Sequence, residues 1–166
     1  MKALPAAAII ALVLVGPAAA QDDAGCSRFA WPVQSERIRL GAAEKPVLDT
    51  GAELAANPAG AFTMRLRRAD QVTLAHPPER KREGHAGYVT IGALPSAGMY
   101  QVTLSQDAWL DLVQNGAFAR SAGSSGRRDC AGLRKSVRFH LQASPIVLQV
   151  SGVEADEISI VIRQIE

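Results

Sequence analysis

The sequence predicts an all-β protein, an antiparallel β-sandwich of about eight strands preceded by one or two short helices. Three observations support this fold class. Apolar and polar residues alternate in many short segments after residue 60, turn-forming stretches such as "HPPERKREG", "LPSAG" and "SAGSSG" separate them, and no long helical pattern lies between them. Many short strands without alternating helices indicate an antiparallel sandwich or barrel.

The strand pattern is clearest in "AFTMRLR" (61–67), where Phe62, Met64 and Leu66 face one way and polar residues the other. An apolar residue recurs at every second position in the further segments that we expect to form strands. They are "QVTLA" (71–75), "YVTIG" (88–92), "YQVTLS" (100–105), "AWLDLV" (108–113), "KSVRFHL" (135–141), "IVLQV" (146–150) and "EISIVIRQI" (157–165).

Two short helices are expected before the strands. "VQSERIRLGAA" (33–43) has Ser35 near its start and Gly41 near its end, which are typical helix boundary residues. "TGAELAANP" (50–58) has the Thr50 and Glu53 spacing of a capping box and stops before Pro58. The first aromatic residues of the mature chain, Phe29 and Trp31, are expected to pack on the core.

Residues 1–20 have the features of a signal peptide: a basic start, an apolar run from 6 to 15 and small residues at 18–20. An uncleaved membrane helix is the alternative, but Gly16 and Pro17 end the apolar run too early to span a bilayer. We therefore expect cleavage before Gln21 and a single domain over residues 21–166. The Ala- and Arg-rich composition indicates the periplasm of a GC-rich bacterium, or secretion.

The charge balance excludes some partners. The full chain has 18 basic and 16 acidic residues, and removal of Lys2 with the signal peptide leaves 17 against 16. A nearly neutral domain gives no basis for nucleic-acid binding. After residue 20, no apolar segment is long enough to span a membrane, so no integral span is expected after cleavage.

Cys26 and Cys130 are the only cysteines, and two cysteines in a small exported domain usually pair. The loop that they would close holds about 105 residues, which in the chain-entropy model stabilises by roughly 4–5 kcal/mol. The bridge would require the two Cα atoms to lie within about 7 Å. It would tie the segment around "FAWP" to the start of the "KSVRFHL" strand.

Two alternatives exist for these cysteines. "AGC" at 24–26 is similar to the end of a lipobox, although Asp22 and Asp23 stand where that signal should be apolar. A reactive thiolate at Cys130 would be favoured by the neighbouring Arg127 and Arg128, but no histidine or nucleophile motif lies close to it in sequence.

His76, His85 and Glu83 are the residue types of a two-histidine, one-carboxylate iron site. Their spacing does not place ligands on one strand face as H-x-H would. Three basic residues lie between the two histidines and would repel a metal cation: Arg80, Lys81 and Arg82. A solvated charged loop is therefore the preferred interpretation, with no metal and no cofactor expected.

Alternation in the strand from 134 places Arg134, Arg138 and His140 on one polar face. Such a face is a candidate for binding an anion, such as a glycan carboxylate or a phosphate, because arginine forks match planar oxyanions. The alternative is an ordinary solvated sheet face. Asp111 lies in a strand, where aspartate is disfavoured, and it is a candidate for a structural ion pair with Lys135, or alternatively with Arg138.

The C-terminal half resembles bacterial pre-peptidase C-terminal-type β-sandwich modules in "AGMYQVTLSQDAWLDLV", "CAGLRKSVRFHL" and "SPIVLQVSG". The whole chain is similar to small secreted proteobacterial proteins with the same "GxYxVxL…AWxD…CxGxRKSVxF" skeleton. Proteins of that set have at times been labelled homogentisate dioxygenase. The resemblance implies a fold more than a function.

The sequence contains no G-x-S-x-G, phosphate-binding loop, dinucleotide fingerprint or H-E-x-x-H. We therefore expect a non-enzymatic binding or accessory module whose partner is a glycan, a cell-envelope component or another periplasmic protein. The alternative is a small metal-dependent enzyme that uses His76, His85 and a nearby carboxylate, in line with the dioxygenase label of similar proteins.

Overall fold

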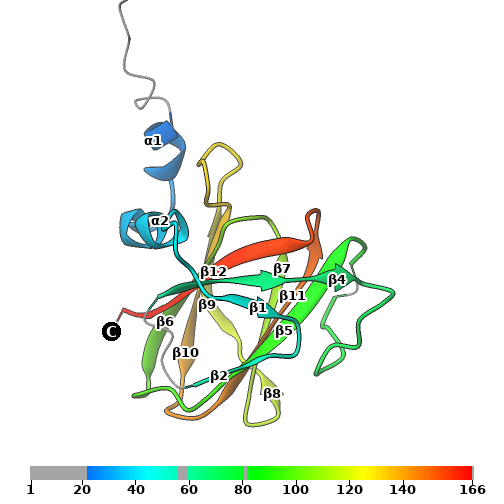
Figure 1. The fold of residues 1–166 in the computed structure, drawn as a ribbon. Helices are drawn as coiled ribbons and strands as arrows, with labels where there is room; N and C mark the ends of the chain where they lie inside the picture. Colours follow the sequence, from blue (N-terminus) through cyan, green and yellow to red (C-terminus); the bar gives the residue numbers. More distant parts are fainter. Residues whose placement is uncertain (1–21, 56–59, 81, 166) are drawn as a thin grey trace, which may run out of the picture.

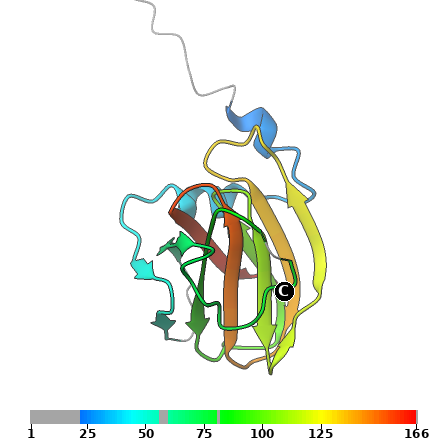
Figure 2. The same ribbon diagram turned by 90° about the vertical axis from the view of Figure 1, so that its right-hand side faces the viewer.

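The computed structural model describes residues 22–55, 60–80 and 82–165, and the predicted signal peptide lies outside them. Two mixed sheets pack face to face as a β-sandwich, which confirms the predicted fold class (Figures 1 and 2). Sheet A has the strand order β1-β3-β12-β6-β10-β9, and sheet B has the order β2-β5-β11-β7-β8, with β4 pairing to β5. No helix among the described residues is long and apolar enough to cross a membrane.

The strands of sheet A are β1 (Val47–Asp49), β3 (Ala61–Arg65), β6 (Gly98–Leu104), β9 (Ser121–Gly126), β10 (Lys135–Leu141) and β12 (Glu157–Gln164). Those of sheet B are β2 (Glu53–Leu54), β4 (Arg67–Arg68), β5 (His85–Ile91), β7 (Trp109–Gln114), β8 (Ala117–Phe118) and β11 (Ile146–Val153). Neighbouring strands are antiparallel except that β1 pairs with β3, and β2 with β5, in parallel.

The core lies between the sheets and is formed by the inward residues of the alternating segments. They include Phe62, Met64, Val89, Ile91, Val102, Leu104, Leu112, Val137, Phe139, Leu141, Leu148, Ile158 and Ile160. Both faces of several central strands are buried, because a second layer covers part of sheet A and a long loop covers part of sheet B. The strand period therefore identified the inner face correctly, and it could not show that the outer faces are covered as well.

The helix predicted around residue 35 is present as α2 (Gln34–Leu40), and a short α1 (Asp22–Cys26) precedes it. The helix predicted over 50–58 is wrong where the structure describes it. Gly51 has φ 91°, in the left-handed region that favours glycine, and Thr50 Oγ1 accepts a hydrogen bond from the Tyr88 amide at 3.0 Å. Pairing with β5 turns Glu53–Leu54 into a strand, so tertiary contacts override the local helix signal.

Residues 22–41, which we call the N-terminal cover, pack on the outer face of sheet A. Phe29, Val33 and Leu40 form a second apolar cluster with Leu133 and Val161. The Cys26–Cys130 disulfide joins the cover to the loop before β10, with the Cα atoms 4.7 Å apart. This confirms the predicted bridge, so neither a free thiol nor a reactive thiolate is present at these two positions.

Candidate functional site

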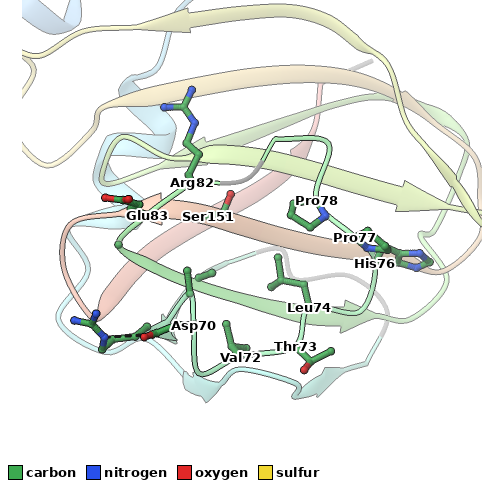
Figure 3. Close-up of a pocket in the computed structure, with 14 residues that line it drawn as sticks. Asp70, Val72, Thr73, Leu74, His76, Pro77, Pro78, Arg82, Glu83 and Ser151 are labelled. Carbon is green, nitrogen blue, oxygen red and sulfur yellow. Dashed lines mark hydrogen bonds and ion pairs between the residues drawn. The ribbon is translucent and has the colours of Figure 1, made fainter.

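The loop of residues 69–80 and 82–84, which we call the arch, crosses the outer face of sheet B between β4 and β5 (Figure 3). Its two ends meet where the Ala69 amide donates to the Gly84 carbonyl at 2.9 Å. Val72 and Leu74 are half-buried and Thr73 between them is exposed, so the predicted alternation is real. The predicted strand 71–75 is nevertheless not assigned as a strand, because the segment lies across a sheet face rather than beside a sheet edge.

Two polar side chains of sheet B form hydrogen bonds with the backbone of the arch, as a neighbouring strand would. Gln149 on β11 and Asp111 on β7 are paired positions in the sheet, and both side chains are buried. The Gln149 amide receives a hydrogen bond from the His76 amide at 3.3 Å and donates to the His76 carbonyl at 3.1 Å. Asp111 Oδ2 accepts from the Glu79 amide at 3.2 Å. These bonds satisfy backbone N–H and C=O groups of the arch that would pair with a neighbouring strand if the segment lay in a sheet.

The proposed Asp111–Lys135 ion pair is not formed. Asp111 accepts instead from Trp109 Nε1 at 2.7 Å, in addition to the arch amide, while Lys135 Nζ donates to the Ala108 carbonyl at 2.6 Å. The carboxylate thus has neutral N–H donors, which are sufficient to satisfy a buried acceptor. Burial lowers the pKa of Lys135, Asp107 opposes this effect, and Arg82 adds to it.

Cations gather around the indole ring of Trp109. The guanidinium of Arg80 lies 4.5 Å from the ring centroid, that of Arg82 5.8 Å, and Lys135 Nζ 5.6 Å. Cation–π contacts of this kind contribute about 0.5–1 kcal/mol each at exposed sites. Two of the three cations belong to the arch, so Trp109 fixes the arch on the same strand that carries Asp111.

A hollow of about 990 Å³ remains between the arch and the sheet. The arch side contributes Val72, Leu74 and Pro78, and the sheet side contributes the small residues Ala86 and Ser151, with Arg68 of β4 at the edge (Figure 3). Because the side chains of Ala86 and Ser151 are short, space remains between the sheet and the arch. The hydroxyl of Ser151 is buried, and it has no hydrogen-bond partner within the described part of the chain.

The arrangement at Ser151 follows from an irregularity in β11. The register with β5 shifts between Val150 and Val153, and Gly152 inside this bulge has φ 74°. A Cβ at Gly152 would lie 2.7 Å from Cδ of Arg82, so a larger residue would displace the arch. The bulge therefore brings the Arg82 stem close to the sheet beside Ser151.

The three candidate metal ligands have different surroundings in the structure. His85 Nδ1 is 3.1 Å from the Glu154 carbonyl, whereas His76 and Glu83 line the hollow. Across residues 22–55, 60–80 and 82–165, no group of three or more His, Cys, Asp or Glu is placed to hold a metal ion. These residues are close in sequence, but the fold does not bring them together as a set of metal ligands.

The predicted basic face is covered rather than open. The Arg138 guanidinium lies 4.3 Å from the Trp31 ring centroid and donates to Gln101 Oε1 at 3.1 Å. Arg134 donates to the carbonyls of Arg128 and Cys130, which braces the loop before β10. His140 alone of the predicted trio is exposed. Sequence alternation gave the correct face, but it could not show that the N-terminal cover packs there.

No protein-family model, curated protein or solved structure matches this chain. The resemblance to pre-peptidase C-terminal-type modules stays a prediction. What the protein does must therefore be inferred from the geometry of the arch, the hollow and the sheet edges.

Replacing Asp111 with alanine is expected to release the arch. The Glu79 amide and Trp109 Nε1 lose the carboxylate that accepts from them, and hydrogen bonds to a charged group contribute about 1.5–3 kcal/mol each. Trypsin, which cleaves after Arg80 and Arg82, should then cut the arch faster than in the parent protein. Asp107→Ala removes the same charge from an exposed position and should leave the cleavage rate unchanged. Equal rates in all three proteins would contradict the clamping role of Asp111.

Proposed function

We propose that the chain is an exported, non-enzymatic binding module whose site is the hollow under the arch. The ligand is a small, mainly apolar molecule that carries one neutral hydrogen-bonding group. The observation that carries this proposal is the buried Ser151 hydroxyl, which lines a hollow of about 990 Å³ and has no partner among the described residues.

The size and lining fit a small molecule. Ligand sites typically measure about 300–1,000 Å³ and are mostly apolar with a few placed polar groups. Val72, Leu74, Pro78 and Ala86 offer an apolar body on both sides of the hollow. None of the lining residues is Trp or Tyr, so the stacking platform that a glycan ring prefers is missing from this set. Of the expected partners, a cell-envelope component with an apolar part fits best.

The polar groups indicate a neutral contact inside and a balanced charge at the mouth. An unpaired buried hydroxyl costs about 1–3 kcal/mol, and a ligand group that donates to or accepts from Ser151 removes that cost. Arg82 and Glu83 are both exposed at the mouth and carry opposite charges. Arg68 and Asp70, which also line the hollow, pair with each other, so positive and negative charges balance in the lining and a neutral ligand group is favoured.

The disulfide supports export. Bridges of this kind form and persist in oxidising compartments and are rare in the cytosol. Together with the predicted signal peptide, the Cys26–Cys130 bridge supports a periplasmic or secreted location, where envelope-derived apolar molecules are encountered.

The fluorescent probe N-phenyl-1-naphthylamine, which is neutral and has one N–H, tests the proposal. We expect saturable fluorescence enhancement with the parent protein. Leu74→Trp, which fills the hollow, should weaken binding more than tenfold, whereas Ala75→Trp on the exposed side should not change it. Ser151→Ala should weaken binding several-fold without destabilising the protein, because the hydroxyl has no partner to lose within the described residues.

The proposal fails if the folded parent protein gives no saturable signal with this probe. It also fails if Leu74→Trp and Ala75→Trp bind the probe equally, since the binding site would then lie elsewhere. Circular dichroism of each variant confirms that the comparison is made between folded proteins.

A further inference from the structure

Strand β9 is a long sheet edge. It pairs with β10 on one side, and within the described residues no strand pairs with its other side. In Figure 2 it is the yellow strand at the rim of the sandwich. The other terminal strands are short: β1 has three residues, and β2, β4 and β8 have two each, against six in β9. Short edges are a usual protection against pairing with another chain, and β9 does not have it.

Other protective devices are also weak in β9. Its sequence, "SAGSSG", contains no proline and no charged residue. A bulge at Ala122 disturbs the start of the strand, where Ser121 and Gly123 pair with consecutive residues of β10. From Gly123 to Gly126 the register with β10 is regular, so the outer backbone groups of this half are arranged as a template for a further strand.

A cleft of about 600 Å³ opens beside β9. Ser124 pairs with Val137, and Ser121 with Phe139, so both serines face the opposite sheet. Because serine is smaller than the valine and phenylalanine beside it, space remains between the two sheets at this edge. The apolar lining on the other side includes Trp109, Leu110, Ala119 and the partly exposed Phe118.

The charges around β9 select the partner. Arg120 precedes the strand and Arg127 and Arg128 follow it, and all three side chains are exposed. Arg120 and Lys135 also line the cleft, where Glu79 is the acidic residue. A strand of six residues spans about 20 Å, so an added segment with acidic residues at both ends would place them near these cations.

A second copy of this chain is a poor occupant of the edge. Antiparallel self-pairing centred on β9 would place Arg120 of one copy opposite Arg127 of the other, at both ends of the pair. Like charges directly opposite each other destabilise strand pairing. The same cations favour an acidic segment of a different protein.

The N-terminal cover fixes β9 in position for such pairing. The Ala30 amide donates to Ser125 Oγ at 3.0 Å, and the Trp31 ring lies against Gly123, where an added Cβ would be 3.3 Å from it. The face of β9 that points away from the cleft is therefore occupied, while its edge stays open. An ordered edge reduces the entropy cost of binding an extended segment.

We propose that β9 receives an extended, acidic segment of a partner protein as an additional strand, with an apolar side chain of that segment in the cleft. Main-chain hydrogen bonds would supply affinity, and the cleft and the flanking arginines would supply specificity. The cleft beside β9 and the hollow under the arch share no lining residue, so this inference does not depend on the ligand proposed above.

The experiment uses a capped nonapeptide probe in which threonine alternates with leucine and valine and two acidic residues stand at each end. Isothermal titration calorimetry should show one-to-one binding. Two matched probes, one with alternate backbone amides N-methylated and one with lysine at the ends, should each bind more than tenfold more weakly. Arg120→Glu combined with Arg127→Glu should reverse the preference between the acidic and the lysine probe. Ser124→Phe, which fills the cleft, should weaken the acidic probe.

Hydrogen exchange locates the site. Binding of the acidic probe should slow exchange of amides in residues 121–126 and not in residues 69–76 of the arch. Three results would overturn the inference: no binding of the acidic probe, equal binding after N-methylation, or slowed exchange of 121–126 in a dimer of this chain without any probe. Binding of N-phenyl-1-naphthylamine measured in the same samples shows independently whether the hollow is functional.

Discussion

Loss of the Cys26–Cys130 disulfide is expected to lower the free energy of unfolding by about 2–5 kcal/mol. The bridge restricts the unfolded chain over a sequence separation of 104 residues, and it holds the N-terminal cover on sheet A. Without it, the cover depends on the small cluster around Phe29, Val33 and Leu133, on the buried ion pair of Glu36 and on a few hydrogen bonds. The first residues of the cover, which lie before these contacts, tend to fray without a tether.

Urea denaturation of the oxidised protein, the reduced protein and the Cys26→Ala/Cys130→Ala variant measures this effect. The reduced protein and the variant should lose similar stability, because both lack the same constraint. Thiol labelling of the oxidised, denatured protein should find no free cysteine. Unchanged denaturation midpoints after reduction would show that the cover is held by its packing alone.

Replacement of Arg163 with methionine is expected to destabilise the fold by about 3–5 kcal/mol, because it leaves a buried carboxylate unpaired. Glu36 on α2 is fully buried, and its Oε1 accepts from Arg163 Nη2 at 2.7 Å and Nε at 2.8 Å. The second oxygen of Glu36 has no partner within the described residues, so Arg163 supplies the charge compensation that the structure shows.

A double variant separates the charge effect from the loss of packing. Glu36→Met combined with Arg163→Met removes both charges and keeps long apolar side chains, so most of the lost stability should return. Thermal or urea denaturation of the single and double variants gives the comparison. If the double variant is as unstable as Arg163→Met alone, the pair acts through shape and not through charge.

The sequence pattern predicted the sandwich because a strand with one buried face must alternate. Phe62, Met64, Val137 and Phe139 all point into the core as their period requires. The helix expected near Thr50 failed because a local cap signal competes with pairing to β5, which lies some 35 positions further along the chain and is invisible in a local pattern.

The candidate site was only partly predictable. Asp111 in a strand correctly indicated a need for partners, but the partners are the Trp109 indole and an arch amide, not Lys135. The hollow depends on how the arch folds back over Ala86 and Ser151, which are ordinary small residues in the sequence. No motif records such an arrangement, because it arises from the space that small side chains leave between two layers.

The position of β12 has a consequence for how the protein is made. This strand comes after all the others in chain order, yet it lies inside sheet A between β3 and β6 (Figure 1). A nascent chain that stops before residue 157 leaves two halves of the sheet without the strand that joins them. Cooperative folding of the sandwich must therefore wait until translation has passed this strand.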